Sequence, residues 1–358
     1  MASTSDGKML FCLPDISGFT KFVAATEISH SQHIVRELLE ALIDANCTGL
    51  QVSEIEGDAV PFYRLGAPPS LAEMVEQARR MFVAFHTQLK KYELYRVCQC
   101  GACASASALT LKVVAHYGAA AAMQVRDHSK FIGTGVIVAH RLLKNSLAQR
   151  EYLLLSDALI EAQQAAPGEL ALFSDGADAY DELGTIAYKT HSLTAYLAQV
   201  SVAPPLPFTL ASPQLVMRIS RHIRAPMRAV YRTLIDLPRR MIWIADVKQV
   251  QVEGDPPNRI GTRHRCLRNS GGDPELVTSD VLVTETTMEL WETDVRKLGT
   301  CRYRLRTAAE DSTDMDVEFH VRGNVLVRLV FRLAMQEKVK AGFEASLLNL
   351  ARLCEAPA

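Results

Sequence analysis

The feature that most constrains this chain is a proline-rich stretch near its middle. Residues 198–213 read AQVSVAPPLPFTLASP, with four prolines among small residues. Proline fixes its own φ and has no amide hydrogen, so this stretch cannot continue a helix or a central strand. We therefore predict a linker over residues 199–213, between a first domain at 1–198 and a second at 214–358. Two domains also suit 358 residues, because a domain usually holds about 100–200.

The composition is that of an ordinary globular protein with balanced charge. Hydrophobic residues make up 48% of the chain and charged residues 22%, which excludes wholesale disorder. Lys and Arg total 39 against 40 Asp and Glu, so no overall field would recruit nucleic acid or an anionic membrane. We therefore predict no nucleic acid partner, and partners must be inferred from local sites.

The first residues and the hydropathy pattern bear on location. MASTSDGKMLFCLPD has only a short apolar run before Pro14 and Asp15, which does not fit a signal peptide or an anchor. No uninterrupted stretch of about 18 apolar residues follows, so we expect no transmembrane segment and a cytoplasmic protein. In that reducing compartment the eight cysteines are expected to be thiols or metal ligands.

Before the linker, strand and helix patterns alternate. Val52–Glu56 and Ala59–Tyr63 alternate as two strands across Gly57-Asp58, a dipeptide suited to a tight hairpin turn. Further strands are predicted at 9–13, 109–116 and 152–156, and helices from 17 and at 33–47, 71–92 and 136–147. This order predicts an α+β sandwich.

After the linker, strands dominate. Leu215–Ile223 is predicted as a strand, and Pro226 opens a helix, because the first turn does not need its missing N–H. Six more strands are predicted at 247–252, 262–267, 277–285, 288–295, 301–307 and 315–321. One long amphipathic helix is predicted from Leu329 to Leu353. A curved antiparallel sheet gripping a terminal helix leaves a cavity, and such cavities usually hold apolar ligands.

Two segments of the first domain carry a family resemblance. LPDISGFTKF at 13–22 and SEIEGDAVPFY at 53–63 resemble the two metal-binding segments of class III adenylate and guanylate cyclases, a ferredoxin-like α/β sandwich. The resemblance implies that Asp15 and Asp58 hold Mg²⁺ or Mn²⁺ on a nucleoside triphosphate, and hard oxygen ligands suit such ions. It also implies phosphate binding by the helix start at Ser17, Gly18, Phe19 and Thr20. Alternatively, both aspartates are turn and cap residues.

A third segment resembles the cyclases with departures. In FIGTGVIVAHRLLKN at 131–145, Arg141 matches the catalytic Arg that stabilises the transition state, whereas Ile137 falls where the family has a ribose-orienting Asn. A branched alkyl chain donates no hydrogen bond, and losing such a contact lowers a rate by about 10² or more. Glu54 and Lys130 fall on the base-reading positions, where neither base is clearly read. We predict that they pair with each other, the alternative being two separate solvated charges.

Three cysteines form a separate cluster. Cys98, Cys100 and Cys103 follow the pattern C-x-C-x-x-C, which suits a shared soft metal such as Zn²⁺, with Cys12 or His116 as a fourth ligand after folding. Buried or surface thiols are the commoner outcome for such a cluster. His116 precedes a glycine at a strand end, where a structural role is expected before a catalytic one.

The second domain resembles the START-like helix-grip (SRPBCC) superfamily over residues 214–354. The signals are RIGTRH at 259–264, the helix start at Pro226 and the terminal helix. The resemblance implies a hydrophobic small molecule or lipid as ligand. Candidate cavity walls, for which plain core roles are the commoner outcome, are Trp243, Trp291, Phe319, Phe331 and Phe343. Strand alternation lets at most alternate members of 263–265 face inward.

These features leave three hypotheses of function. The first is an active class III nucleotidyl cyclase that makes a cyclic nucleotide. The second, which the departures favour, is a catalytically impaired cyclase-homology module that binds a metal-nucleotide or a partner and is coupled to a ligand-sensing second domain. The third is lipid or polyketide binding or processing by the second domain. The cyclase resemblance implies a homodimer in the first two cases.

Overall fold

The computed structural model describes residues 7–24, 28–55, 57, 59–126, 128–253 and 258–356, which form two compact units. The first unit comprises residues 1–93 and 105–202, and the second comprises 94–104 and 203–358. The division at 202/203 lies inside the predicted linker. Residues 94–104, which the sequence places in the first domain, belong to the second unit. The chain therefore passes into the second unit and returns before it crosses the linker.

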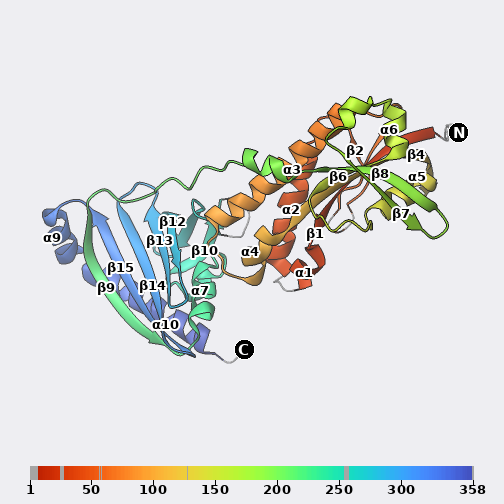
Figure 1. Cartoon of the computed structure of the whole chain (residues 1–358). Coiled ribbons are helices and arrows are strands. Elements are labelled where there is room, and N and C mark those ends of the chain that lie inside the picture. The colour runs from red at the N-terminus through yellow and green to blue at the C-terminus, as the bar shows by residue number, and fades with distance from the viewer. Residues whose placement is uncertain are drawn as a thin grey trace. The chain divides into compact units, whose positions relative to one another are not determined.

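The first unit is built on one mixed sheet (Figure 1). The strand order is β2-β3-β1-β4-β6-β8-β7, with β5 paired to β4, and only β4 and β6 run parallel. The strands are β1 (Gly7–Ser17), β2 (Gln51–Val52), β3 (Phe62–Leu65), β4 (Thr110–Val125), β5 (His128–Ile132), β6 (Tyr152–Ser156), β7 (Ser174–Tyr180) and β8 (Gly184–Ser192). The main helices are α2 (Ile28–Asp44), α3 (Leu71–Tyr95), α5 (Thr134–Leu142) and α6 (Asp157–Gln163). The predicted α+β sandwich is confirmed.

The buried strand β1 orients the side chains of the site. Met9, Phe11 and Leu13 pack with Ala139 of α5, so these odd-numbered positions face that helix. Successive side chains of a strand point to opposite faces, and Leu10 and Cys12 on the other face are also fully buried. The same alternation continues to Asp15, which therefore points to the α5 side of the sheet.

Two glycines let α5 approach the sheet closely. A Cβ at Gly118 of β4 would lie 2.7 Å from the Cα of Gly135, and a Cβ at Gly135 would lie 2.7 Å from the carbonyl carbon of Gly118. Real Cβ atoms do not tolerate such contacts, so helix and strand meet here backbone against backbone. This contact fixes the height of α5 over the sheet.

The second unit is a seven-stranded antiparallel sheet in the order β10-β11-β12-β13-β14-β15-β9. Its strands are β9 (Pro213–Ile223), β10 (Val247–Val252), β11 (Arg263–Arg268), β12 (Glu275–Val283), β13 (Thr287–Asp294), β14 (Gly299–Ala309) and β15 (Ser312–Arg322). All seven predicted strands are present, within three residues at each end. The helices are α7 (Met227–Ile235), α8 (Arg240–Trp243), α9 (Val325–Ala334) and α10 (Gln336–Glu355). No helix within these described parts has the length and apolar character needed to cross a membrane.

The predicted single terminal helix is wrong, because the chain breaks at Met335 between α9 and α10. Asn324 caps α9 by accepting hydrogen bonds from Leu326 N and Val327 N. Leu329 and Leu333, expected on the buried face, are 50% and 81% exposed. Helix α9 reaches the sheet through Phe331, whereas α10 packs on it through a longer apolar face, with Leu347 and Leu350 buried. Apolar spacing continues through the break, so periodicity alone did not reveal it.

Candidate functional site

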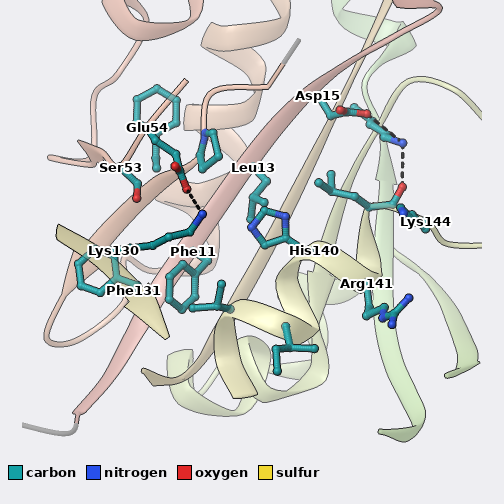
Figure 2. Close-up of a pocket in the computed structure, with 16 residues that line it drawn as sticks. Phe11, Leu13, Asp15, Ser53, Glu54, Lys130, Phe131, His140, Arg141 and Lys144 are labelled. Carbon is teal, nitrogen blue, oxygen red and sulfur yellow. Dashed lines mark hydrogen bonds and ion pairs between the residues drawn. The ribbon is translucent and has the colours of Figure 1, made fainter. Parts of the chain in front are cut away.

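A pocket of about 660 Å³ lies over the α5 face of the first sheet. Figure 2 shows Glu54 and Lys130 at one end of it, Asp15 and Lys144 at the other, and His140 between them. The described residues that line the pocket are Phe11, Leu13, Asp15, Ser53, Glu54, Pro61, Phe62, Lys112, Lys130, Phe131, Val136, Ile137, His140, Arg141, Leu143 and Lys144. Four candidates drawn from separate sequence segments, Asp15, Glu54, Lys130 and Arg141, therefore share one pocket.

At one end of the pocket, Asp15 is paired with Lys112. The antiparallel register of β1 and β4 sets these two residues directly opposite each other, where cross-strand side chains on one face meet. Lys112 Nζ lies 3.1 Å from Asp15 Oδ2, and both side chains are less than one-fifth exposed. The same ammonium donates to the carbonyl oxygen of Leu143 at 2.8 Å, at the C-terminal end of α5, where a cation is favourable. Lys112 is thus held from two sides.

Sequence reasoning missed Lys112, although a signal was present. It is the one charged residue within LTLKVVAHYG at 109–118, a run that is otherwise apolar or aromatic apart from one Thr and one His. A charged side chain is rarely buried in a strand unless it is paired. Strand alternation predicts which face of the sheet Asp15 is on, but it does not identify Lys112 as its neighbour, because neither segment alone determines the register between β1 and β4.

At the other end, Glu54 and Lys130 form the predicted ion pair, with Lys130 Nζ 3.4 Å from Glu54 Oε1. Lys130 belongs to β5, and Glu54 follows β2 in the hairpin that leads to β3. The side chains are 59% and 38% exposed, so the pair adds only about 0–1 kcal/mol to the free energy of unfolding. The predicted contact is confirmed, and the ion pair contributes little to the stability of the fold.

Helix α5 supplies the remaining polar edge of the pocket. Ile137 and Arg141 are four residues apart, hence neighbours on one helix face, and both line the pocket. Ile137 is 51% exposed, so a branched alkyl group faces solvent where the cyclase resemblance expects an amide. Among the described residues, Arg141 and the nearby Lys144 have no carboxylate within ion-pair distance.

The other residues suggested by the cyclase resemblance are placed differently. Ser17 ends β1, Gly18 has φ +91°, and Phe19 begins α1 (Phe19–Ala24), a helix of six residues that also contains Thr20. None of these four residues is among the lining residues. Asp58 lies outside the described residues, although its neighbour Ala59 forms an isolated backbone bridge with Asp15.

His116 has the contacts of a structural residue, and it lies inside β4, not at the predicted strand end. Its Nδ1 lies 2.8 Å from the hydroxyl of Ser156, which in turn caps α6 by accepting from Leu159 N. A Cβ at the following Gly118 would lie 2.5 Å from His116 Nε2, so the ring is enclosed on that side. Burial lowers the pKa of His116 to about 4, which keeps the imidazole neutral near pH 7.

The second unit contains a buried ionic group that the sequence did not single out. Arg240 Nη2 lies 2.7 Å from Glu292 Oε1, Nη1 donates to Glu292 Oε2 at 2.9 Å, and both side chains are at most 1% exposed. His264 Nε2 lies 3.0 Å from Arg240 Nη1, and burial lowers the pKa of His264 to about 4. Arg263 and Arg265 are exposed on either side of it, as strand alternation predicts.

The five aromatic candidates of the second unit have different surroundings. Trp243 and Phe331 are buried, and Phe319 contacts the rings of Phe331 and Phe343 at centroid distances of 5.8 and 6.1 Å. Trp291 instead lies under the guanidinium of Arg302, 4.7 Å from the ring centroid. Among the described residues, Trp243 and Phe331 thus pack as core residues, while Phe319 and Phe343 are half-buried and pack together. Trp291 packs against the side chain of Arg302.

Two family models match parts of this chain. Residues 214–355 match the model described as "Polyketide cyclase / dehydrase and lipid transport", which confirms the resemblance predicted for the second domain. Residues 35–152 match "Protein of unknown function (DUF2652)". An uncharacterized protein of Mycobacterium tuberculosis is 31% identical over 135 residues, which is 38% of this chain and 63% of that protein.

Similar solved structures include both kinds of nucleotide cyclase. The guanylyl cyclase Cya2 aligns with a TM-score of 0.40 and 14% identity, covering 56% of this chain and 99% of that one. The adenylyl cyclase CyaB from P. aeruginosa aligns with a TM-score of 0.37 and 15% identity, covering 52% of this chain and 95% of that one.

Proposed function

We propose that the first unit is a cyclase-homology module that binds an anionic ligand of the nucleoside triphosphate class but does not turn it over efficiently. In this proposal the second unit takes up a hydrophobic small molecule or lipid, and the two binding events are coupled. The observation that carries the proposal is the ion pair between Asp15 and Lys112.

The Lys112 ammonium stands beside the carboxylate that would hold a catalytic metal. Mg²⁺ requires near-octahedral oxygen coordination and gives up its waters reluctantly. Here Asp15 Oδ2 already has a fixed cation 3.1 Å away, and Lys112 is also hydrogen-bonded to Leu143 O. The residues in this arrangement therefore do not fit a metal on Asp15 unless Lys112 moves. Metal binding by Asp15 together with Asp58 stays a prediction.

The charge of the pocket supports an anionic ligand without a metal. Among the described residues, the lining holds four basic side chains, Lys112, Lys130, Arg141 and Lys144, against the two carboxylates of Asp15 and Glu54. The two carboxylates are matched by Lys112 and Lys130. Within this described lining, Arg141 and Lys144 are two positive charges without a matching carboxylate, and guanidinium groups suit phosphate oxygens.

The residue that α5 presents at position 137 does not favour cyclisation of a nucleotide. Cyclisation requires the ribose hydroxyl to be held in line with the α-phosphate, and a side chain that orients the ribose contributes by positioning. Ile137 stands at the matching place and has neither donor nor acceptor. The described lining thus retains groups that suit phosphate binding, whereas at position 137 it has no group that could orient a ribose.

For the second unit, the family description and the grip of α10 on the sheet support a hydrophobic ligand. Polar contacts hold this helix in place: Ala245 N donates to Ser346 Oγ at 2.9 Å, and Asn349 Nδ2 donates to the carbonyl oxygen of Trp243 at 3.3 Å. Tryptophan emission should change when a fatty acid or an aromatic polyketide-like probe is bound, because Trp243 is buried and adjoins α10.

The test is calorimetric titration of the full chain with ATP and with GTP, in Mg²⁺, in Mn²⁺ and in EDTA, followed by chromatography of the products. We expect binding that persists in EDTA and no cyclic nucleotide. Arg141→Met should weaken binding about 10-fold or more, the effect of losing one charge-assisted hydrogen bond. Lys90→Met on the exposed surface of α3 is the matched control and should leave binding unchanged.

Lys112→Met separates this proposal from an active cyclase. If the ammonium replaces a metal, its removal should make nucleotide binding depend on Mg²⁺ or Mn²⁺, because Asp15 would lose its cation. Metal-dependent binding with cyclic product in the unmodified protein would instead establish the active cyclase. Absence of nucleotide binding under all three conditions would also overturn the proposal.

A further inference from the structure

Outside the pocket, the structure gathers three cysteines of the second unit. The Sγ atoms of Cys98, Cys100 and Cys103 all lie within 4.8 Å of one another. Cys98 and Cys103 are each 4% exposed, and Cys100 is intermediate. Cys98 and Cys100 precede α4 (Gly101–Ser105), and Cys103 lies within it. None of the eight cysteines forms a disulfide in the described structure.

The backbone around these sulfurs is arranged to donate hydrogen bonds to them. Cys100 N lies 3.4 Å from Cys98 Sγ, and Cys103 N lies 3.5 Å from Cys100 Sγ. Amide donors at such distances lower the electron density on a thiolate and orient its lone pairs, as they do around metal-bound cysteines. A turn with successive N–H groups directed at sulfur thus suits thiolate ligands.

The turn is itself held firmly within the second unit. Arg96 Nη1 donates to the carbonyl oxygen of Cys103 at 3.1 Å, and Tyr231 Oη donates to the carbonyl oxygen of Val97 at 3.0 Å. Arg96 also pairs through its backbone with Arg259. These contacts fix the chain on both sides of the cysteines, so the three sulfurs are brought together by the fold, in addition to their nearness in sequence.

We propose that Cys98, Cys100 and Cys103 bind one thiophilic metal ion, Zn²⁺, as three thiolates. In tetrahedral coordination with Zn–S near 2.3 Å, sulfurs stand about 3.8 Å apart, so the present cluster needs to contract by about 1 Å at most. Within the described part of the chain, no further His, Cys, Asp or Glu joins the group. The described residues thus supply three ligands, and in this proposal water or a small exogenous ligand takes the fourth position.

The expected fourth ligands are engaged elsewhere. His116 has its Nδ1 on Ser156, and Cys12 is fully buried within β1, where it pairs with Phe62 and Ala115. Both belong to the first unit, whereas the cysteine cluster belongs to the second. Within the described parts of the chain, the site therefore has three protein ligands. Such an ion would fix the segment by which the chain enters the second unit and leaves it again.

The first test measures metal directly. Protein purified in Zn²⁺-containing buffer without chelator should carry one zinc per chain by mass spectrometry of the metal. Replacement with Co²⁺ should give the intense ultraviolet charge-transfer absorption of cobalt thiolates, which needs no variant and reports sulfur ligands specifically. Absence of that absorption at a saturating Co²⁺ concentration would overturn the proposal.

The second test uses matched cysteine variants of the full chain. Cys100→Ser, the least buried of the three, should weaken Zn²⁺ binding by at least about 100-fold, in proportion to the loss of one ligand from a thiolate site. Cys354→Ser, in the same unit but outside the cluster, should bind Zn²⁺ as the unmodified protein does. Equal binding by Cys100→Ser and the unmodified protein, or protein that is metal-free and 2 Da lighter through a disulfide, would refute the site.

Discussion

The buried pair of Arg240 and Glu292 gives the sharpest stability prediction for the second unit. Its two groups are at most 1% exposed and meet through contacts of 2.7 and 2.9 Å. Replacing Glu292 by Gln keeps the shape of the side chain but removes its negative charge. The NH₂ group of the new amide then faces the guanidinium of Arg240, and both groups are hydrogen-bond donors. Arg240 keeps its bond to Leu234 O at 3.1 Å, yet its charge loses its counterion while it stays buried. Breaking one side of such a pair costs about 3–5 kcal/mol.

Tryptophan fluorescence is the assay that isolates this effect. The chain has two tryptophans, and both Trp243 and Trp291 belong to the second unit. Their emission during urea unfolding therefore follows that unit without a signal from the first. We expect Glu292→Gln to lower the free energy of unfolding in this transition by about 3–5 kcal/mol, with an unchanged dependence on urea.

The double variant Arg240→Met, Glu292→Leu is the control that separates charge from packing. It removes both charges and keeps apolar volume, and such exchanges are often neutral or stabilising. We expect it to be more stable than Glu292→Gln. If Glu292→Gln costs less than about 1 kcal/mol, or the double variant is the less stable of the two, then the stated electrostatic cost of an unpaired Arg240 is refuted.

Four further outcomes are expected. Burial lowers the pKa of His116 and of His264 from 6.5 to about 4, so as the pH falls the unfolded chain is protonated at these residues before the folded chain is. Both units should therefore lose stability between pH 6.5 and 4, by up to roughly 1.4 kcal/mol per pH unit per histidine. Urea unfolding at several pH values measures this loss. Gly135→Ala should destabilise the first unit, measured by circular dichroism, because its Cβ would lie 2.7 Å from the Gly118 carbonyl carbon, whereas Gly168→Ala meets no atom within 4 Å and should not. Lys130→Cys should raise affinity for GTP by releasing its carboxylate partner, and an unchanged dissociation constant would contradict that role for the ion pair. Light scattering should report a homodimer of about twice 39.5 kDa, and a strict monomer at high concentration would remove a site shared between two copies.

Much of the fold could be predicted because local patterns determine it. Strand alternation placed β10 at Val247–Val252 as the structure has it. The two strands predicted at Val52–Glu56 and Ala59–Tyr63 around a tight turn are wrong, because β2 ends at Val52 and β3 begins at Phe62, which leaves Glu54 in the connection between them. The contact between Glu54 and Lys130 also followed, because the resemblance related two distant segments to one pocket. These predictions needed only periodicity, turn chemistry and one family pattern.

The remaining features depend on tertiary contacts that no local pattern records. Residues 94–104 connect a helix and a strand of the first unit, yet they belong to the second, because Tyr231 donates to the carbonyl oxygen of Val97 and Arg96 forms a backbone bridge with Arg259. The break at Met335 interrupts an apolar pattern that continues on both sides. Lys112 lies beside Asp15 because of the register of β1 against β4, and that register depends on the packing of the whole sheet.

The two ion pairs of the pocket differ in how easily a ligand can displace them. Lys112 is less than one-fifth exposed and is fixed by strand register, by Asp15 and by the end of α5, so separating it requires the carboxylate or the helix to move. Glu54 and Lys130 are 38% and 59% exposed at 3.4 Å, and opening that pair costs only about 0–1 kcal/mol. A ligand can therefore exchange its own contacts for those of Glu54 and Lys130 at little cost, while the cation beside Asp15 stays in place. It follows that changes to Glu54 or Lys130 should alter which ligand is preferred, whereas changes to Lys112 should alter whether binding needs a metal.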